Sequence, residues 1–206
     1  IIKAATLRNK KMKLRLKIVL NFALIILSFK SFSQADTIPV FKDLQLALKS
    51  PKDVIKLDLS KQKLSEFPIE IYQFTNLKEL YLSKNRMESI PADINKLTNL
   101  EIIDFSKNKL TQLPVQLFDC IKLKKIIVNQ NDISTIPKEI GKLNQLEYLD
   151  MWSTNIGAVP DEIKHCRNLK EIDFRVIEMT RMEQDRIKVI IPKVIIHFSP
   201  YCTCSR

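Results

Sequence analysis

The chain has 206 residues and a formal net charge of +11, from 34 Lys and Arg against 23 Asp and Glu. Residues 1–33 hold eight of the basic residues and no acid, so the remainder carries 26 basic against 23 acidic residues, a balance of +3. A nucleic-acid-binding protein needs a strongly basic face on its folded part. Because the excess positive charge lies in the first 33 residues, we predict no nucleic-acid partner.

The first 33 residues have the layout of a secretory signal peptide. A basic segment begins at Met12, an apolar run of 12 residues extends from Ile18 to Phe29, and small residues precede a cleavage site before Gln34. An uncleaved membrane anchor is the alternative, although spanning a bilayer takes ~20 apolar residues. We predict cleavage after residue 33, export (secreted, periplasmic or at the cell surface), and no stable membrane insertion of the mature chain. Residues 1–11 precede the first methionine and are interpreted as an upstream extension.

Residues 34–53 are too few to form a domain of their own. Phe41, Leu44 and Leu48 recur at helical spacing, and Pro51 ends the pattern. We expect one helix here, acting as an N-terminal cap. A cap is needed because the terminal units of a stacked repeat array expose apolar core.

Residues 54–191 repeat with a period of 23 residues, over about six units. Proline recurs at this spacing, at Pro68, Pro91, Pro114, Pro137 and Pro160. A leading apolar residue recurs in the same register, at Val54, Leu77, Leu100, Leu123, Leu146 and Leu169. The fourth and sixth places of each unit are apolar and share one face of a short strand, and proline suits a tight return. No unit buries its apolar positions alone, so the units must stack into one core.

The run LKELYLSKNRMESIPADINKLTN, residues 77–99, resembles the leucine-rich repeat family in its 23-residue LPxxI form. That form occurs in Ras-binding repeat scaffolds and in exported bacterial proteins. The resemblance implies an α/β fold, a curved right-handed solenoid with a parallel sheet on its concave face and short helical or extended returns on its convex face. It also implies that asparagines at the ninth place, Asn85, Asn108 and Asn131, bond backbone groups of successive turns, which need partners when buried. We expect Asn108, with units stacked on both sides, to be buried.

The sixth unit departs from the repeat, because Glu183 stands where the other units have proline. We predict a short helix there, ended by Pro192, and a last strand over residues 194–198. The apolar residues predicted to line the helix are Met179, Met182, Ile187 and Ile190. Residues 192–206 are interpreted as a C-terminal strand cap followed by a Cys-x-Cys tail.

The four cysteines fall into two pairs. Cys120 and Cys166 occupy the same core place two units apart, ~10 Å from each other at ~4.8 Å per strand. That distance exceeds the ~7 Å limit for a disulfide, so both are predicted to be free. Cys202 and Cys204 follow His197 as H-x4-C-x-C, which is either a partial metal site or a surface or cap-closing pair. A structural zinc site takes four ligands, so we predict no metal and leave the role and redox state of this pair open.

No catalytic arrangement is found in the sequence: it has no Ser-His-Asp constellation, no phosphate-binding glycine loop and no closed metal set. A row of aspartates does occupy the fifth place, at Asp58, Asp104, Asp150 and Asp173. We interpret it as a solvated ladder rather than as paired catalytic carboxylates, because no pocket that would shift a pKa is indicated. We therefore predict that the protein is not an enzyme and has no cofactor.

Side chains at the third, fifth and seventh places face away from the core. In leucine-rich repeat proteins this concave face usually binds the partner. The residues that we predict to bind are Trp152, Tyr148, Ile127, Tyr81, Ile102 and Arg175. Trp, Tyr and Arg are enriched at binding hot spots, although scattered apolar exposure is also ordinary. We predict a module that binds a protein partner through this face, with a structural or self-associating envelope or surface protein as the alternative. The sequence does not specify the partner or the oligomeric state.

Overall fold

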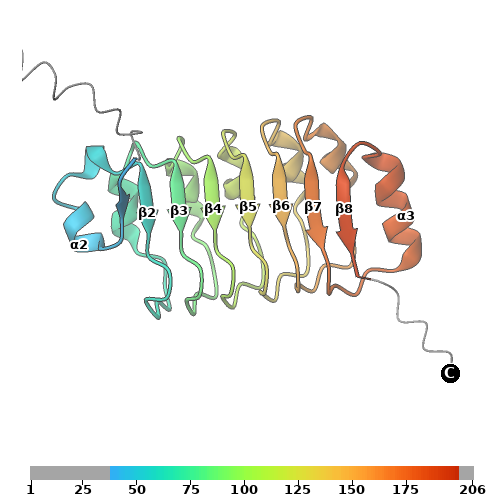
Figure 1. The fold of residues 1–206 in the computed structure, drawn as a ribbon, viewed down its shortest axis with the longest axis horizontal. Coiled ribbons are helices and arrows are strands. Elements are labelled where there is room, and N and C mark those ends of the chain that lie inside the picture. Colours follow the sequence, from blue (N-terminus) through green and yellow to red (C-terminus); the bar gives the residue numbers. More distant parts are fainter. Residues whose placement is uncertain (1–37, 200–206) are drawn as a thin grey trace, which may run out of the picture. The chain divides into compact units, whose positions relative to one another are not determined.

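The computed structural model describes residues 38–199; the predicted signal peptide and the Cys-x-Cys tail lie outside them. The described residues form an open sheet of eight short parallel strands, ordered β1 to β8 along the chain (Figure 1). The strands are β1 (Val40–Phe41), β2 (Lys56–Asp58), β3 (Glu79–Tyr81), β4 (Ile102–Asp104), β5 (Lys125–Ile127), β6 (Tyr148–Asp150), β7 (Glu171–Phe174) and β8 (Ile195–Phe198). The predicted α/β solenoid with a parallel sheet and short returns is confirmed.

Short 3-10 helices form the returns behind the sheet. They are η3 (Ile69–Gln73), η4 (Ala92–Lys96), η5 (Val115–Asp119), η6 (Lys138–Lys142) and η7 (Asp161–His165). Each begins directly after the repeat proline, which lies in extended backbone with φ between −60° and −68°. Proline fixes φ in this range and has no N–H to leave unpaired, so it starts the return at the same place in each of the first five units.

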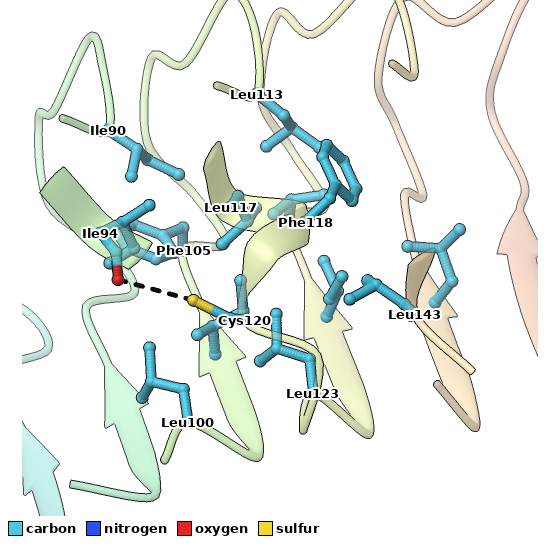
Figure 2. Close-up of a cluster of buried hydrophobic side chains, with 14 of the residues drawn as sticks. Ile90, Ile94, Leu100, Phe105, Leu113, Leu117, Phe118, Cys120, Leu123 and Leu143 are labelled. Carbon is cyan, nitrogen blue, oxygen red and sulfur yellow. Dashed lines mark hydrogen bonds between the residues drawn. The ribbon is translucent and has the colours of Figure 1, made fainter. Parts of the chain in front are cut away.

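The apolar core lies between the sheet and the returns. Leu80 and Leu82, the fourth and sixth places of their unit, are fully buried, and the same places are buried in the other units. From β2 to β7, strand residues pair with the residue 23 positions away, as Leu80 pairs with Leu57 and Ile103. This register stacks equivalent places on one another, so the units share one continuous core, whose central part Figure 2 shows.

Side-chain amides tie successive turns together at the ninth place. Asn85 Nδ2 donates to the Leu59 carbonyl of the preceding turn at 3.0 Å and to the Leu82 carbonyl of its own turn at 2.9 Å. Its Oδ1 accepts from two backbone N–H groups of the preceding turn. Asn108 and Asn131 donate the equivalent pairs of bonds and accept one each. We call these three residues the asparagine ladder.

Burial along the asparagine ladder is uneven. Asn85 and Asn131 are 8% and 5% exposed, whereas Asn108 is half-buried. The expectation that Asn108 is buried is therefore wrong. Its side chain lines an open groove along the turns, so stacked neighbours on both sides do not enclose it.

A second row links the units where the strands begin. The second place carries alternating charges, in the order Lys78, Glu101, Lys124, Glu147 and Lys170. Lys78 Nζ and Lys124 Nζ lie 2.9 and 2.7 Å from the Glu101 carboxylate, and Lys170 Nζ lies 2.7 Å from Glu147. We call this row the charge ladder. Exposed pairs of this kind contribute little to stability, because water and salt screen them.

The N-terminal end contains a strand that the sequence did not indicate. β1 precedes the helix α2 (Leu44–Ala47) and pairs with β2, and η2 (Pro51–Asp53) follows. Asp43 caps α2 by accepting from Leu46 N at 2.8 Å. Two residues are too few for alternating hydrophobicity to predict a strand, which is why only a helix was expected here.

The C-terminal end has the predicted helix and strand, with a different buried face. Helix α3 (Arg181–Ile190) precedes β8, and Met179 and Ile187 are buried. Met182 is 83% exposed, so its placement among the lining residues is wrong. It stands five residues before Ile187, ~140° away around the helix at 3.6 residues per turn.

Among residues 38–199, no helix has the length and hydropathy to span a bilayer.

Candidate protein-binding surface

The outward side chains of β2 to β8 form three rows, which together we call the strand face. The third-place row is Lys56, Glu79, Ile102, Lys125, Tyr148, Glu171 and Ile195. The fifth-place row is Asp58, Tyr81, Asp104, Ile127, Asp150, Asp173 and His197. The seventh-place row is Ser60, Ser83, Ser106, Asn129, Trp152 and Arg175. All six predicted binding residues therefore stand on the strand face; Arg175 is exposed and the other five are half-buried.

The register separates these six residues into near and distant members. Tyr148 and Trp152 come from β6 and the residues after it, Ile127 from neighbouring β5, and Arg175 follows neighbouring β7. Tyr81 stands on β3, three strands from β6, which is ~14 Å at the usual strand spacing. The apolar surface around Trp152 therefore includes Tyr148 and Ile127, while Tyr81 lies outside it.

The fifth-place aspartates fasten each strand to its turn. Asp58, Asp104 and Asp150 each accept, through Oδ1, from the backbone N–H two residues later, at 3.0, 2.8 and 3.1 Å. Asp173 does the same with Arg175 N at 3.0 Å and is 5% exposed. The interpretation of this row as a solvated ladder is wrong for Asp173. The carboxylates serve as acceptors for local backbone, a bond that a strand-and-turn pattern in sequence does not reveal.

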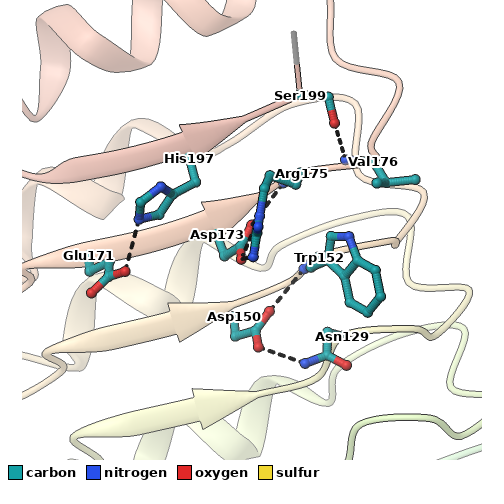
Figure 3. A network of polar contacts seen from close by, with 9 residues as sticks. All are labelled: Asn129, Asp150, Trp152, Glu171, Asp173, Arg175, Val176, His197 and Ser199. Carbon is teal, nitrogen blue, oxygen red and sulfur yellow. Dashed lines mark hydrogen bonds and ion pairs between the residues drawn. The ribbon is translucent and has the colours of Figure 1, made fainter.

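A polar network surrounds Trp152 (Figure 3). Trp152 N donates to Asp150, whose second oxygen accepts from Asn129 Nδ2 at 2.6 Å. On the next strand, Arg175 donates to both oxygens of Asp173 through Nε and Nη2, at 2.6–3.1 Å. These bonds hold the carboxylates in place beside the indole ring.

At the far end of the sheet, His197 Nε2 lies 2.9 Å from Glu171 Oε1. The backbone N–H of Val176 donates to Ser199 Oγ at 2.6 Å. Both contacts join β8 and the residue after it to the β7 unit, so side-chain contacts continue to the last strand of the strand face.

The two neighbouring aspartates have pKa values displaced in opposite directions. Burial, with the charges of Asp173 and Asp104, raises the pKa of Asp150 against the hydrogen bonds that it accepts. Burial also opposes ionisation of Asp173, but the hydrogen bonds and charge of Arg175 dominate and lower its pKa. Pairs of carboxylates whose pKa values are displaced in opposite directions often mark acid–base sites. Here both are already bonded to backbone and side chains, so the displacement follows from the network itself.

A groove of about 1040 Å³ runs along the turns that follow β5, β6 and β7. It lies where the asparagine ladder ends, because Thr154 and Ile177 occupy the ninth place of the last two units. Thr154 Oγ1 donates to Met151 O of its own turn at 2.8 Å. The lining of the groove is mostly polar and includes Gln130, Asp132 and Ser153. The changed residues at the ninth place are visible in the sequence, but the groove beside them is not.

The predicted core thiols are confirmed. Cys120 and Cys166 are buried and free, and their Sγ atoms donate to the carbonyls of Ile94 and Ile140 at 3.5 and 3.2 Å; Figure 2 shows the first bond. Burial raises the pKa of both thiols to about 12, with the Asp119 charge contributing at Cys120. Neither thiol is therefore a nucleophile at neutral pH. Cys202 and Cys204 lie outside the described residues, and within residues 38–199 no three His, Cys, Asp or Glu side chains are grouped to hold a metal ion.

Comparison with known proteins gives a family and a set of similar folds. A sequence profile of the leucine-rich repeat region matches residues 53–188. The comparison with curated proteins finds no match. A leucine-rich repeat protein of Leptospira interrogans is 27% identical with a TM-score of 0.60, over 76% of this chain and 45% of that one.

Two further solved structures extend the comparison. The ectodomain of the plant receptor kinase GASSHO1/SCHENGEN3 from Arabidopsis thaliana, solved with CASPARIAN STRIP INTEGRITY FACTOR 2, is 28% identical with a TM-score of 0.58, over 69% of this chain and 18% of that one. An internalin from Listeria monocytogenes, at 19% identity and a TM-score of 0.57 over 70% and 40%, is similar in fold alone. The chain spans less than half the length of each of these three proteins.

Proposed function

The chain belongs to the leucine-rich repeat family, a general protein-interaction scaffold, and from this premise we propose that it is an exported, non-enzymatic module that binds a protein partner through its strand face. The binding centre in this proposal is Trp152, with Tyr148 and Ile127 as further apolar contacts and Arg175 at the margin. Ile102 and Tyr81 lie farther along the sheet and would contact only a partner that covers several strands.

The observation that carries this proposal is that hydrogen bonds hold the groups around Trp152 in place. Its backbone and the flanking Asp150 and Asp173 are held by hydrogen bonds, and the indole ring is half-exposed. Aromatic anchors inside a polar rim are the usual anatomy of a protein interface. Side chains that are held before binding lose little conformational freedom when a partner docks.

The non-enzymatic part of the proposal is supported by the engagement of the carboxylates. Leucine-rich repeat proteins are typically binding scaffolds rather than enzymes. The fifth-place aspartates, the residues that most resemble acid–base groups, already accept hydrogen bonds from the backbone of their own turns. A carboxylate that accepts such a hydrogen bond stabilises the end of its strand instead of acting as a base toward a substrate.

Export is supported by the layout of residues 1–33 and by the ectodomain among the similar structures. Intact-mass measurement of the natural protein tests it. A mature chain that begins near Gln34 is expected, and a protein that retains the segment from Met12 would contradict the proposal.

The binding proposal is tested by an affinity pull-down with the chain from Gln34, followed by titration of the captured partner. Trp152→Ala should weaken binding by ~2 kcal/mol, about 30-fold, as hot-spot truncations do. Stability should change little, because the side chain lies outside the apolar core. The matched control is Ile69→Ala, an apolar residue of η3 that is 68% exposed on the return side.

Asp161, at the start of η7, is unsuitable as a control because it bonds Arg186 of α3. Normal binding by Trp152→Ala together with weakened binding by Ile69→Ala would assign the partner to the return side. The alternative, self-association, predicts a mass in solution above that of the monomer and loss of that association in Trp152→Ala.

A further inference from the structure

Six basic residues lie in the loops that follow β2, β3 and β4, on the edge of the sheet where the strands end. These loops are at the bottom of Figure 1. The six residues occupy the eighth and tenth places of the first three units and are all exposed: Lys61, Lys63, Lys84, Arg86, Lys107 and Lys109. We call this group the basic edge. It belongs to the three loops after β2, β3 and β4, and so lies beside the strand face rather than on it.

The backbone of the basic edge is rigidly held. The eighth-place residues Lys61, Lys84 and Lys107 adopt left-handed φ angles of 63°, 57° and 56°. Their N–H groups donate to carbonyls of the following turn at 2.8–2.9 Å. The asparagine ladder fixes the residue between the two basic places in the second and third of these loops. The charged groups therefore rise from anchor points repeated at the strand spacing of ~4.8 Å.

None of the six side chains makes an ion pair or a side-chain hydrogen bond with any described residue. Several lysines elsewhere in the repeats are paired, as Lys124 is with Glu101 and Lys142 with Asp119. The carboxylates that follow in the same loops, Glu66 and Glu88, reduce the net charge of the three loops from +6 to +4. Like charges on neighbouring strands weaken a fold, and no contact within residues 38–199 offsets that cost.

The basic edge stops at β5. At the same two places the next three units carry Gln130, Asp132, Ser153, Asn155, Val176 and Glu178. The edge of the sheet is thus divided into a half with six cations and a half with two carboxylates. An overall charge count hides this division, because the two halves partly cancel.

We propose that the basic edge binds an acidic polypeptide segment of a partner protein, a run of Asp and Glu lying across the three loops. The three rows span ~10 Å, the length of about three residues of extended chain. Five of the six cations are Lys, whose compact ammonium groups on flexible stems can follow carboxylates along an extended chain.

Other anionic partners fit the basic edge less well. The three loops carry no exposed aromatic side chain, and single-stranded nucleic acids bind through aromatic stacking. An anionic bilayer would also meet Asp132 and Glu178 on the same edge, and those charges would repel it.

A fluorescent polyglutamate peptide of roughly ten residues, ~33 Å when extended, is the probe for this proposal. The full chain should bind it, and binding should weaken as salt screens the charges. The triple variant K61Q/K84Q/K107Q should bind at least about fivefold more weakly, since each exposed ion pair contributes modestly. Thermal unfolding at the wild-type temperature would show that the variant remains folded.

The control is K138Q/K164Q/K193Q, which removes the same charge from exposed positions away from the basic edge. These three lysines form no ion pair within residues 38–199, and the variant should change binding less than twofold. Equal weakening by the two triple variants would overturn the proposal, as would unaltered binding by the first. Stronger basic-edge-dependent binding of anionic vesicles or duplex DNA than of polyglutamate would also overturn it. Trp152→Ala should leave peptide binding unchanged, so this test is independent of the strand-face proposal.

Discussion

The middle of the stack and its C-terminal end bond backbone groups of neighbouring turns by different means. In the turns that follow β3, β4 and β5, the asparagine ladder repeats one neutral side-chain amide. At the C-terminal end, where Thr154 and Ile177 replace asparagine, a cluster of charges does related work. Glu183 accepts from Val159 N at 2.9 Å, and Arg186 bonds Glu183, Asp161 and the Val159 carbonyl.

This difference shows what a repeat requires where it ends. An internal turn has a neighbour on each side, so one residue type in one register serves every unit. The last turn is covered by α3 instead, and Glu183, which stands in the place of the repeat proline, reaches back to the preceding unit. Neutral amides therefore bond the interior turns at the ninth place, and ionised groups bond α3 to the preceding unit.

The largest effect is expected from Asn131→Ala. Asn131 is 5% exposed, and its loss leaves Leu110 N and the carbonyls of Phe105 and Val128 without its hydrogen bonds. Unfolding by denaturant should show a loss of ~3 kcal/mol, because several buried groups lose partners. Thr154→Ala, which removes one bond from the equivalent place, should cost ~1 kcal/mol. Equal losses would mean that the ladder is not the source of stability.

Arg186→Met tests the charged end. The substitution keeps an apolar stem and removes the guanidinium that joins α3 to η7. We expect a loss of ~2 kcal/mol and lowered hydrogen-exchange protection across α3. The control on the same helix is Lys188→Met, whose contacts with Asp185 and the Phe198 ring are exposed and should cost under ~1 kcal/mol. Protection lost evenly over the whole sheet would show that α3 and the repeats unfold together.

Lowering the pH should destabilise the C-terminal end of the stack before it destabilises the middle. Hydrogen bonds from Arg186 lower the pKa of Glu183, with burial acting against them. The stabilisation is therefore present above the unfolded value of ~4.3 and is lost as the pH falls through the lowered folded pKa. The asparagine ladder does not titrate in this range. Exchange protection factors should fall in α3 before they fall in β3 to β5 as the pH is lowered below ~4, and a parallel decline would contradict the division.

The smallest effect is expected at Val176, at the eighth place of the last unit. Its φ is 55°, a left-handed conformation that is costly for a β-branched residue, and it is 59% exposed. Val176→Asn should raise the melting temperature and stabilise the fold by ~1 kcal/mol. Lys107→Asn, at the same place with φ 56°, should gain less, because lysine is not β-branched. A gain at Lys107 equal to that at Val176 would remove the branched side chain as the cause.

Features set by the repeat were predictable from sequence. The period places Leu80 and Leu82 in the core and Cys120 and Cys166 beside them, because each unit must bury the same places. The helix and strand at the C-terminal end were also predicted, because Pro192 and an apolar run mark their boundary. These inferences need only the spacing of apolar residues and the constraints on proline.

Features that depend on neighbouring chain segments were not predictable. β1 exists because the edge of β2 accepts it, although Val40–Phe41 has no pattern of its own. The hydrogen bond that Asp173 accepts from Arg175 N depends on how the chain bends after β7. The placement of Trp152 on the strand face follows from its place in the unit, but the hydrogen bonds that fix its surroundings appear only once Asn129 and Asp150 are brought together.

The charge ladder has a consequence for how such a chain can lengthen or shorten. Lys78, Glu101, Lys124, Glu147 and Lys170 alternate in sign, so each unit differs from both neighbours at its second place. Duplicating or deleting a single unit would bring two like charges side by side, which is unfavourable on adjacent strands. Duplicating or deleting two adjacent units would preserve the alternation. On this criterion the segment that can be duplicated or deleted without loss is a pair of units, twice the length of the structural repeat.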